Sequence, residues 1–179
     1  VRSRGLGDVY KRQMLQSLFD SQIKSLGIVF GVILLMFLVI FRSIKVAVIG
    51  LIPNILTASS VLGLLGILSI PLDIMTITVA AISVGMAVDN TIHYLYRYKV
   101  EISNGVAPSD AILKSHTTIG RAILYTALTI SIGFLIFSFS NFSPTVLFGT
   151  FTSLAIFTSL VATLILLPLL LQSFKAFDS

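Results

Sequence analysis

The sequence predicts an all-α membrane protein, a bundle of five transmembrane helices. Of its 179 residues, 56% are hydrophobic and only 11% are charged, and the mean hydropathy is +1.03. Several apolar runs are about 20 residues long, the length at which an α-helix crosses the hydrocarbon core of a bilayer. The chain has no cysteine, and its two histidines lie in separate segments. We therefore expect neither a disulfide framework nor a zinc site, and we predict no cofactor.

Five apolar runs account for the predicted spans. The second run contains Pro53 and Asn54, which we interpret as a proline kink rather than a functional hinge, because neighbouring helices can satisfy a freed backbone carbonyl. Segment 14–25 has spaced apolar residues and predicts a helical lead-in, either interfacial or continuous with the first span. The predicted spans are residues 26–41, 46–70, 74–96, 122–140 and 145–171, and a short tail follows at 172–179.

The first residues differ in composition from the rest of the chain. Residues 1–13 are polar and basic, and they resemble the translated sequencing adapter found at the ends of gene fragments, so we expect them to be foreign to the fold. This segment holds four of the 12 basic residues and one of the 7 acidic residues, which leaves eight basic and six acidic residues elsewhere. The excess of positive charge therefore belongs largely to the segment, and we expect no nucleic-acid partner.

Basic residues mark alternate connections between the spans. They flank the connections after the first and third spans and follow the fifth, whereas "SIPLD" and "SNFSP" contain neither Lys nor Arg. Connections rich in Lys and Arg stay in the cytoplasm, so we predict that the chain starts outside and ends inside. In the cytoplasmic connection, about residues 99–120, "APSDAILKS" predicts a short amphipathic helix, and His116 is expected to be an exposed loop residue. The basic residues of these regions are Arg42, Lys45, Arg97, Lys99, Lys114, Arg121 and Lys175. Lys24 is an exception on the outer side, where it lies near enough to the interface for its charge to reach the membrane surface.

The third span carries polar residues in the stretch "VGMAVDNTIHYLYRY". Counted from Ile74 at about 1.5 Å per residue, Asp89 lies about 22 Å into a core about 30 Å thick. A carboxylate at this depth is costly, so we expect Asp89 to face the bundle interior and to be paired, protonated or hydrated. Desolvation favours its neutral form, which suits a group that takes up and releases a proton.

Two residues share the helix face of Asp89. Gly85 and His93 lie four residues before and after it, and residues at this spacing are neighbours on a helix. Gly85 would leave room for a neighbouring helix or a water molecule. His93 could hydrogen-bond to Asp89 or exchange a proton with it.

Small residues indicate where helices could approach closely. Gly27 and Gly31 form a GxxxG pattern, and further small residues occur in the later spans. Such residues allow tight helix packing, so we expect one compact bundle with the third span at its centre. The further small residues are Gly63, Gly66, Ala80, Ala81, Gly85 and Gly133.

The polar stretch is similar to a motif of the resistance-nodulation-division (RND) superfamily, and most of all to its MMPL and Patched-like lipid-exporter branches. "GMAVD" followed by "NTIHYLYRY" resembles the GxxxD motif with a downstream His and Arg in the fourth or tenth transmembrane helix. The resemblance covers about residues 14–171 and includes "IFRSIK" and "IPN". Each half of such a protein has one helix, a large extracytoplasmic domain and five more helices. The chain would then be the last five helices of one half, and we favour the C-terminal half.

The resemblance implies a fragment of a transporter that uses the proton-motive force to export hydrophobic or amphiphilic substrates, a class that includes lipids. Asp89 would carry the proton, with Asn90 and His93 in the relay. Relatives often have Asp or Tyr at the position of Asn90, which cannot titrate, so this half would supply one proton-carrying group. Thr126 and Thr129 on the next span could line the relay or simply pack. No chemistry on the substrate is expected, so the protein would not be an enzyme.

Two other classes of membrane protein have features in common with this sequence. A sterol-sensing-like module that binds lipid or regulates without proton coupling would have the same architecture. An intramembrane aspartyl protease needs two aspartates on facing helices, but Asp73 and Asp89 belong to the same span. The expected partners are membrane lipids, the substrate, the missing N-terminal half and extracytoplasmic domains, and a second copy in a homo-oligomer. The expected location is the bacterial inner membrane.

Overall fold

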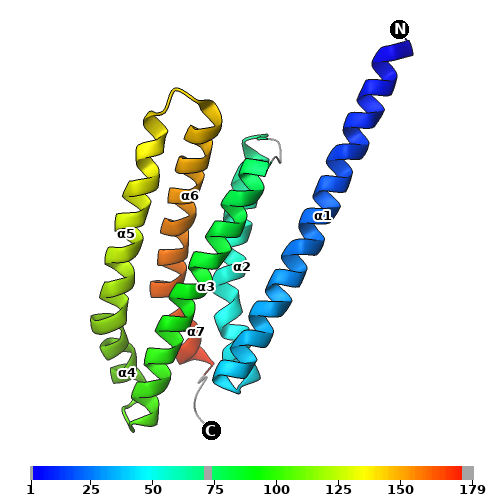
Figure 1. Ribbon diagram of the computed structural model, residues 1–179. Helices are drawn as coiled ribbons and strands as arrows, with labels where there is room; N and C mark the ends of the chain where they lie inside the picture. The colour runs from blue at the N-terminus through cyan, green and yellow to red at the C-terminus, as the bar shows by residue number, and fades with distance from the viewer. Residues whose placement is uncertain (1, 71–73, 175–179) are drawn as a thin grey trace.

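The computed structural model describes residues 2–70 and 74–174, with side chains from residue 21 onward except those of residues 22 and 74. All regular structure in this part of the chain is helical, and five helices are long and apolar enough to cross a membrane. This confirms the predicted fold class (Figure 1). The long helices are α1 (Arg2–Phe41), α2 (Ile44–Ile67), α3 (Ile74–Ser103), α5 (Arg121–Leu135) and α6 (Ser143–Val161). The short elements are α4 (Pro108–Ser115), the π-helical turns η1 (His116–Gly120) and η3 (Ala162–Leu166), the 3₁₀ turn η2 (Ile136–Phe139) and α7 (Leu167–Ser173).

The fourth and fifth spans are longer than predicted because short helices extend them. Helix α4 begins at Pro108, as the Pro-Ser-Asp group predicts, and continues through η1 into α5. The non-helical part of the predicted connection is therefore only residues 104–107, where Gly105 has a positive φ of 78° that a glycine adopts without strain. The candidate spans are Ile23–Phe41, Ile44–Ile67, Met75–Ser103, Pro108–Phe139 and Ser143–Ser173.

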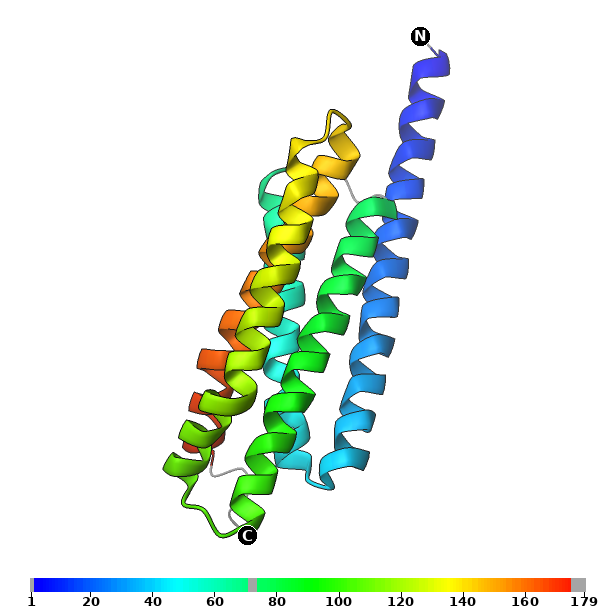
Figure 2. The ribbon, with the colours of Figure 1, turned by 60° about the vertical axis from the view of Figure 1, so that its left-hand side comes forward.

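Helix α1 is a single helix of 40 residues. Of the two alternatives left open for segment 14–25, the backbone favours the helix that continues into the first span. The N-terminal part of α1 projects beyond the other helices in both views (Figures 1 and 2). We expect residues 1–13 to be foreign to the fold and therefore to make no packed contacts, but their side chains lie outside the described residues.

Helix α3 packs into the bundle with one face and leaves the face of Asp89 open, so the prediction of a centrally packed third span is met only in part. It packs against α2 and α6 and also contacts α1 and α4 (Figure 2). Its inner face consists mostly of small residues, which let the three helices approach closely. Ala80, Ser83, Ala87 and Thr91 on this face are fully buried.

Among the described glycines, the tightest surroundings occur at two that the GxxxG pattern did not single out. A Cβ atom on Gly149 of α6 would collide with the backbone carbonyl of Phe134, and one on Gly50 of α2 would collide with Leu95. At Gly27, Gly31, Gly63, Gly66, Gly85 and Gly133 a Cβ would meet no other atom within 4 Å. The close approach that these six glycines would allow therefore does not occur at them in the described part of the chain.

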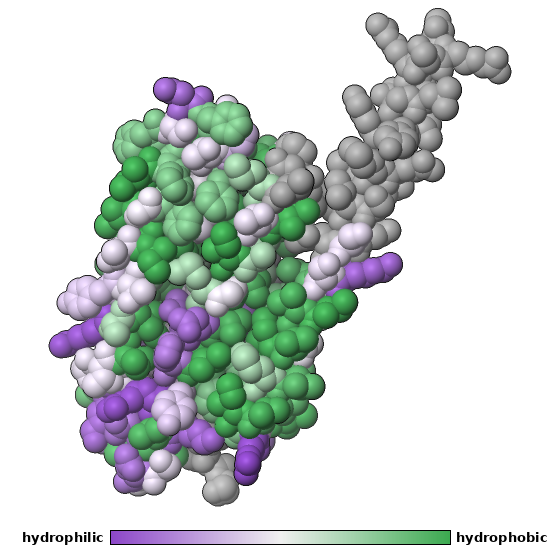
Figure 3. Space-filling view, viewed as in Figure 1, coloured by the Kyte–Doolittle hydropathy of each residue, from purple (hydrophilic) through white to green (hydrophobic). Residues whose placement is uncertain are grey.

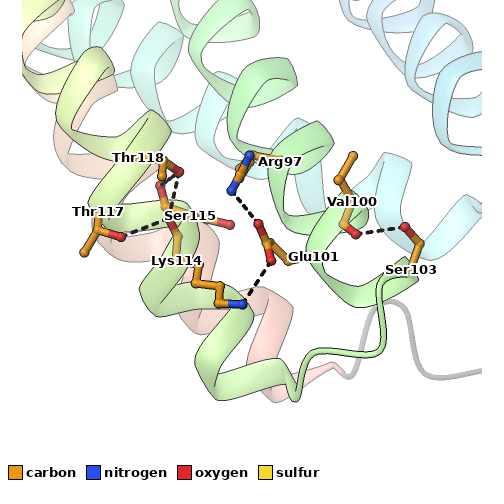
Figure 4. A network of polar contacts seen from close by, with 8 residues as sticks. All are labelled: Arg97, Val100, Glu101, Ser103, Lys114, Ser115, Thr117 and Thr118. Carbon is orange, nitrogen blue, oxygen red and sulfur yellow. Dashed lines mark hydrogen bonds and ion pairs between the residues drawn. The ribbon is translucent and has the colours of Figure 1, made fainter.

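Apart from Lys24 on α1, the basic side chains of the described residues lie toward one end of the bundle, which we call the basic end. It contains the α1–α2 turn, the α3–α4 connection and α7 (Figure 1). Here the carboxylate of Glu101, whose side chain is only 8% exposed, accepts contacts from Arg97 on its own helix and from Lys114 of α4, at 3.6 Å (Figure 4). This network fixes α4 against the end of α3.

Candidate functional site

Asp89 lies on the open face of α3 rather than inside the bundle. Its side chain is 71% exposed, whereas Ala87 and Thr91, two residues away on either side, are fully buried. The small-residue face of α3 packs against α2 and α6, and Asp89 points away from these two helices. The expectation that Asp89 faces the interior of this bundle is therefore wrong. In Figure 3, hydrophilic residues interrupt the apolar surface over α3.

His93 is the ion-pairing partner that the described residues give to Asp89. Its Nε2 lies 3.4 Å from Oδ1 of Asp89, and its side chain is 59% exposed. The four-residue spacing thus places both groups on one face, as predicted. Arg97, one further turn along α3, turns instead toward Glu101. Asp89 and His93 therefore form a separate ionisable pair in the middle of a membrane span.

Gly85 opens this face toward α1. It lines a groove of about 400 Å³ between α1 and α3, together with Val88 and Ala81. The groove is almost wholly apolar, and its lining reaches Val88, the residue directly before Asp89. A Cβ atom on Gly85 would meet no neighbouring side chain or helix within 4 Å, so the described residues leave open space beside it.

The remaining predicted site residues are not joined to the pair. Asn90 is half-buried, and the described residues give its side chain no hydrogen bond. Thr126 and Thr129 are exposed on α5, which packs on α6, and neither hydrogen-bonds to Asp89 in the part of the chain described. The structure thus brings together Gly85, Asp89 and His93 and leaves both threonines apart from them.

A second polar contact, missed in the sequence, centres on His116. The hydroxyl of Tyr94 lies 2.7 Å from Nδ1 of His116, and Nε2 of His116 lies 2.9 Å from the carbonyl oxygen of Leu164. Because a carbonyl only accepts, Nε2 carries the hydrogen and Nδ1 accepts from Tyr94. One imidazole therefore links α3 to both π-helical turns, η1 and η3.

The expectation that His116 is an exposed loop residue is wrong because α4 runs directly into α5. The residue begins a π-helical turn, and its ring is half-buried edge-on against Tyr94, with 5.5 Å between ring centroids. Tyr94 is fully buried. The sequence offers no local signal for the contact, because Tyr94 lies 22 residues before His116 and Leu164 lies 48 residues after it.

We expect His116→Ala to destabilise the bundle by about 1–3 kcal/mol, because it leaves the buried Tyr94 hydroxyl without its acceptor. Tyr94→Phe removes that hydroxyl, so the double variant should be less destabilised than the sum of the two single variants. Thermal unfolding of the four proteins in detergent measures the coupling. Strict additivity would show that the contact contributes nothing.

The fold and the site together define an integral membrane protein with an ionisable pair on the surface of a central span. The sequence profile of the MMPL family matches residues 7–177. The chain belongs to the MMPL family.

Two relatives agree with this assignment. The chain is 29% identical over 139 residues to "Putative membrane protein MJ1562" of Methanocaldococcus jannaschii, a match that covers 78% of this chain and 36% of that protein. It is 25% identical over 146 residues to "Probable transport protein MmpL11" of Mycobacterium leprae, which covers 80% of this chain and 14% of that protein. The chain thus spans well under half the length of both relatives.

Proposed function

We propose that this chain is part of a transporter that exports hydrophobic or amphiphilic molecules, lipids among them, at the expense of a proton gradient. The main observation that supports this proposal is the pair of Asp89 and His93, which is exposed on the bundle surface within a membrane span. Ionisable groups at such depth are costly, so they are retained mainly where they bind ions, protons or substrates. Family membership and the name of the mycobacterial relative support transport as the activity.

In this proposal the open face of α3 is covered by a second helical bundle. A carboxylate that is 71% exposed would otherwise lie against lipid tails. The second bundle comes from the rest of the protein or from a second copy, and extracytoplasmic domains complete the assembly. Asp89 then takes up a proton from one side of the membrane and releases it to the other. His93 assists, and Asn90 supplies a hydrogen bond that cannot titrate.

The proposed transporter does no chemistry on its substrate. Its location is the inner membrane of a bacterial cell, with the basic end in the cytoplasm, because the basic residues gather at that end. The apolar groove between α1 and α3 favours a second candidate, a sterol-sensing-like module that binds lipid without proton coupling.

An uncoupler distinguishes the two candidates. We expect the full-length protein in proteoliposomes to move a fluorescently labelled phospholipid under an imposed pH gradient, and the rate to fall to its no-gradient level when a protonophore is added. A transport rate indifferent to the protonophore would contradict proton coupling. Saturable binding of the same probe without gradient-dependent movement would support the sterol-sensing-like module.

A further inference from the structure

A second groove lies at the basic end, away from the face of Asp89. It measures about 440 Å³ and lies between the first turns of α2 and Phe174, which follows α7. Its lining is apolar apart from Lys45 and includes Ile44, Val48 and Ile52. These three residues are spaced four apart and form one strip along α2. The strip extends about 12 Å, most of the thickness of one membrane leaflet.

Two cations lie where this strip begins, at the start of α2, and neither has an acidic partner among the described residues. Arg42, in the α1–α2 turn, and Lys45 are both exposed. Three other cations of the basic end are engaged: Arg97 and Lys114 contact Glu101, and Lys99 contacts the Ile40 carbonyl and the Phe41 ring. Arg121 is also exposed, but it does not line the groove. The positive charge beside the groove is therefore available to a ligand.

The turn itself also favours an anion. Arg42 has a φ of 51°, which ends α1 sharply and allows α2 to begin two residues later. Ser43 at the start of α2 makes no side-chain capping bond, so the first amide groups of α2 are not capped by that side chain. These amides add partial positive charge near Lys45.

We propose that this groove binds an anionic phospholipid of the leaflet at the basic end. Lys45 and Arg42 contact the phosphate, and one acyl chain lies along Val48 and Ile52. A soluble anion would leave the apolar strip empty, and an uncharged lipid would leave both cations unpaired. A lipid with a negative headgroup matches both parts of the site. Basic pockets between membrane helices bind such headgroups in other membrane proteins. This bound lipid is separate from any transported molecule.

Native mass spectrometry of the full-length protein, titrated in detergent with phosphatidylglycerol or phosphatidylcholine, tests the site. We expect Lys45→Gln to weaken retention of phosphatidylglycerol by about fivefold, the effect of one cation near an anionic lipid. Val48→Trp should abolish the same bound lipid by filling the strip. Arg121→Gln is the matched control, because Arg121 is also an exposed cation at the basic end but does not line the groove.

Three outcomes would overturn the proposal. The first is equal retention of the two lipids by the unmodified protein. The second is retention of phosphatidylglycerol that Lys45→Gln leaves unchanged or that Arg121→Gln weakens equally. The third is full displacement of the lipid by inorganic phosphate, with Val48→Trp having no effect, which would show that the turn binds anions alone. A specific loss in both groove variants supports the proposed lipid site.

Discussion

Asp89→Asn in the full-length protein is expected to reduce gradient-driven transport to the no-gradient rate without impairing membrane insertion. The substitution preserves the shape of the side chain and removes its titration. Because Asp89 is largely exposed on this bundle, the change breaks no packing between the five helices. Its effect should therefore fall on proton transfer. The free energy of placing a charged side chain at this depth in the membrane is about 3 kcal/mol higher than that of a neutral one.

His93→Ala should have a smaller effect than Asp89→Asn. His93 contacts Asp89 at 3.4 Å and assists proton transfer, so its loss should slow transport or shift its pH optimum. The measurement is movement of a fluorescently labelled phospholipid in proteoliposomes under an imposed pH gradient, at matched protein content. Asp110→Asn is the control, because this carboxylate is exposed on α4 at the basic end. Normal transport by Asp89→Asn would exclude it as the proton carrier of this part of the protein.

Gly149→Ala is expected to destabilise the protein by about 1–3 kcal/mol, the range found for overpacked cores. The added methyl group would collide with the carbonyl of Phe134 and with Phe137, which fix the packing of α6 against the end of α5. Backbone atoms cannot move aside as a flexible side chain can, so the helices themselves must separate.

Gly63→Ala is the matched control for Gly149→Ala. It adds the same methyl group within another membrane span, where the methyl group would meet nothing within 4 Å beyond its chain neighbours and the backbone of its own helix. Thermal unfolding of both variants in detergent measures the difference. Equal stability of the two variants would show that the close approach at Gly149 contributes nothing.

The sequence by itself determined the fold class and most of the spans. The length and apolarity of the five runs suffice for this, because a bilayer requires every backbone polar group to be bonded within a helix. The spacing of Asp89 and His93 likewise determined that they share a face, since a helix places residues four apart side by side. The small residues of α3 predicted its packing only in part, since Ala80 is buried against the neighbouring helices whereas Ala81 and Gly85 are exposed.

Only the tertiary structure decided which way each helix face points. Helix α3 has a polar face with Asp89 and a face of small residues, and either could pack against neighbouring helices. The small-residue face packs on α2 and α6, so Asp89 lies on the surface of the bundle. The same holds for the glycines, since helix crossings place Gly149, and not Gly27 or Gly31, against a neighbour. His116 meets Tyr94 and Leu164 because α4, η1 and α5 form one continuous rod. Such contacts depend on the relative positions of separate helices, which local sequence patterns do not specify.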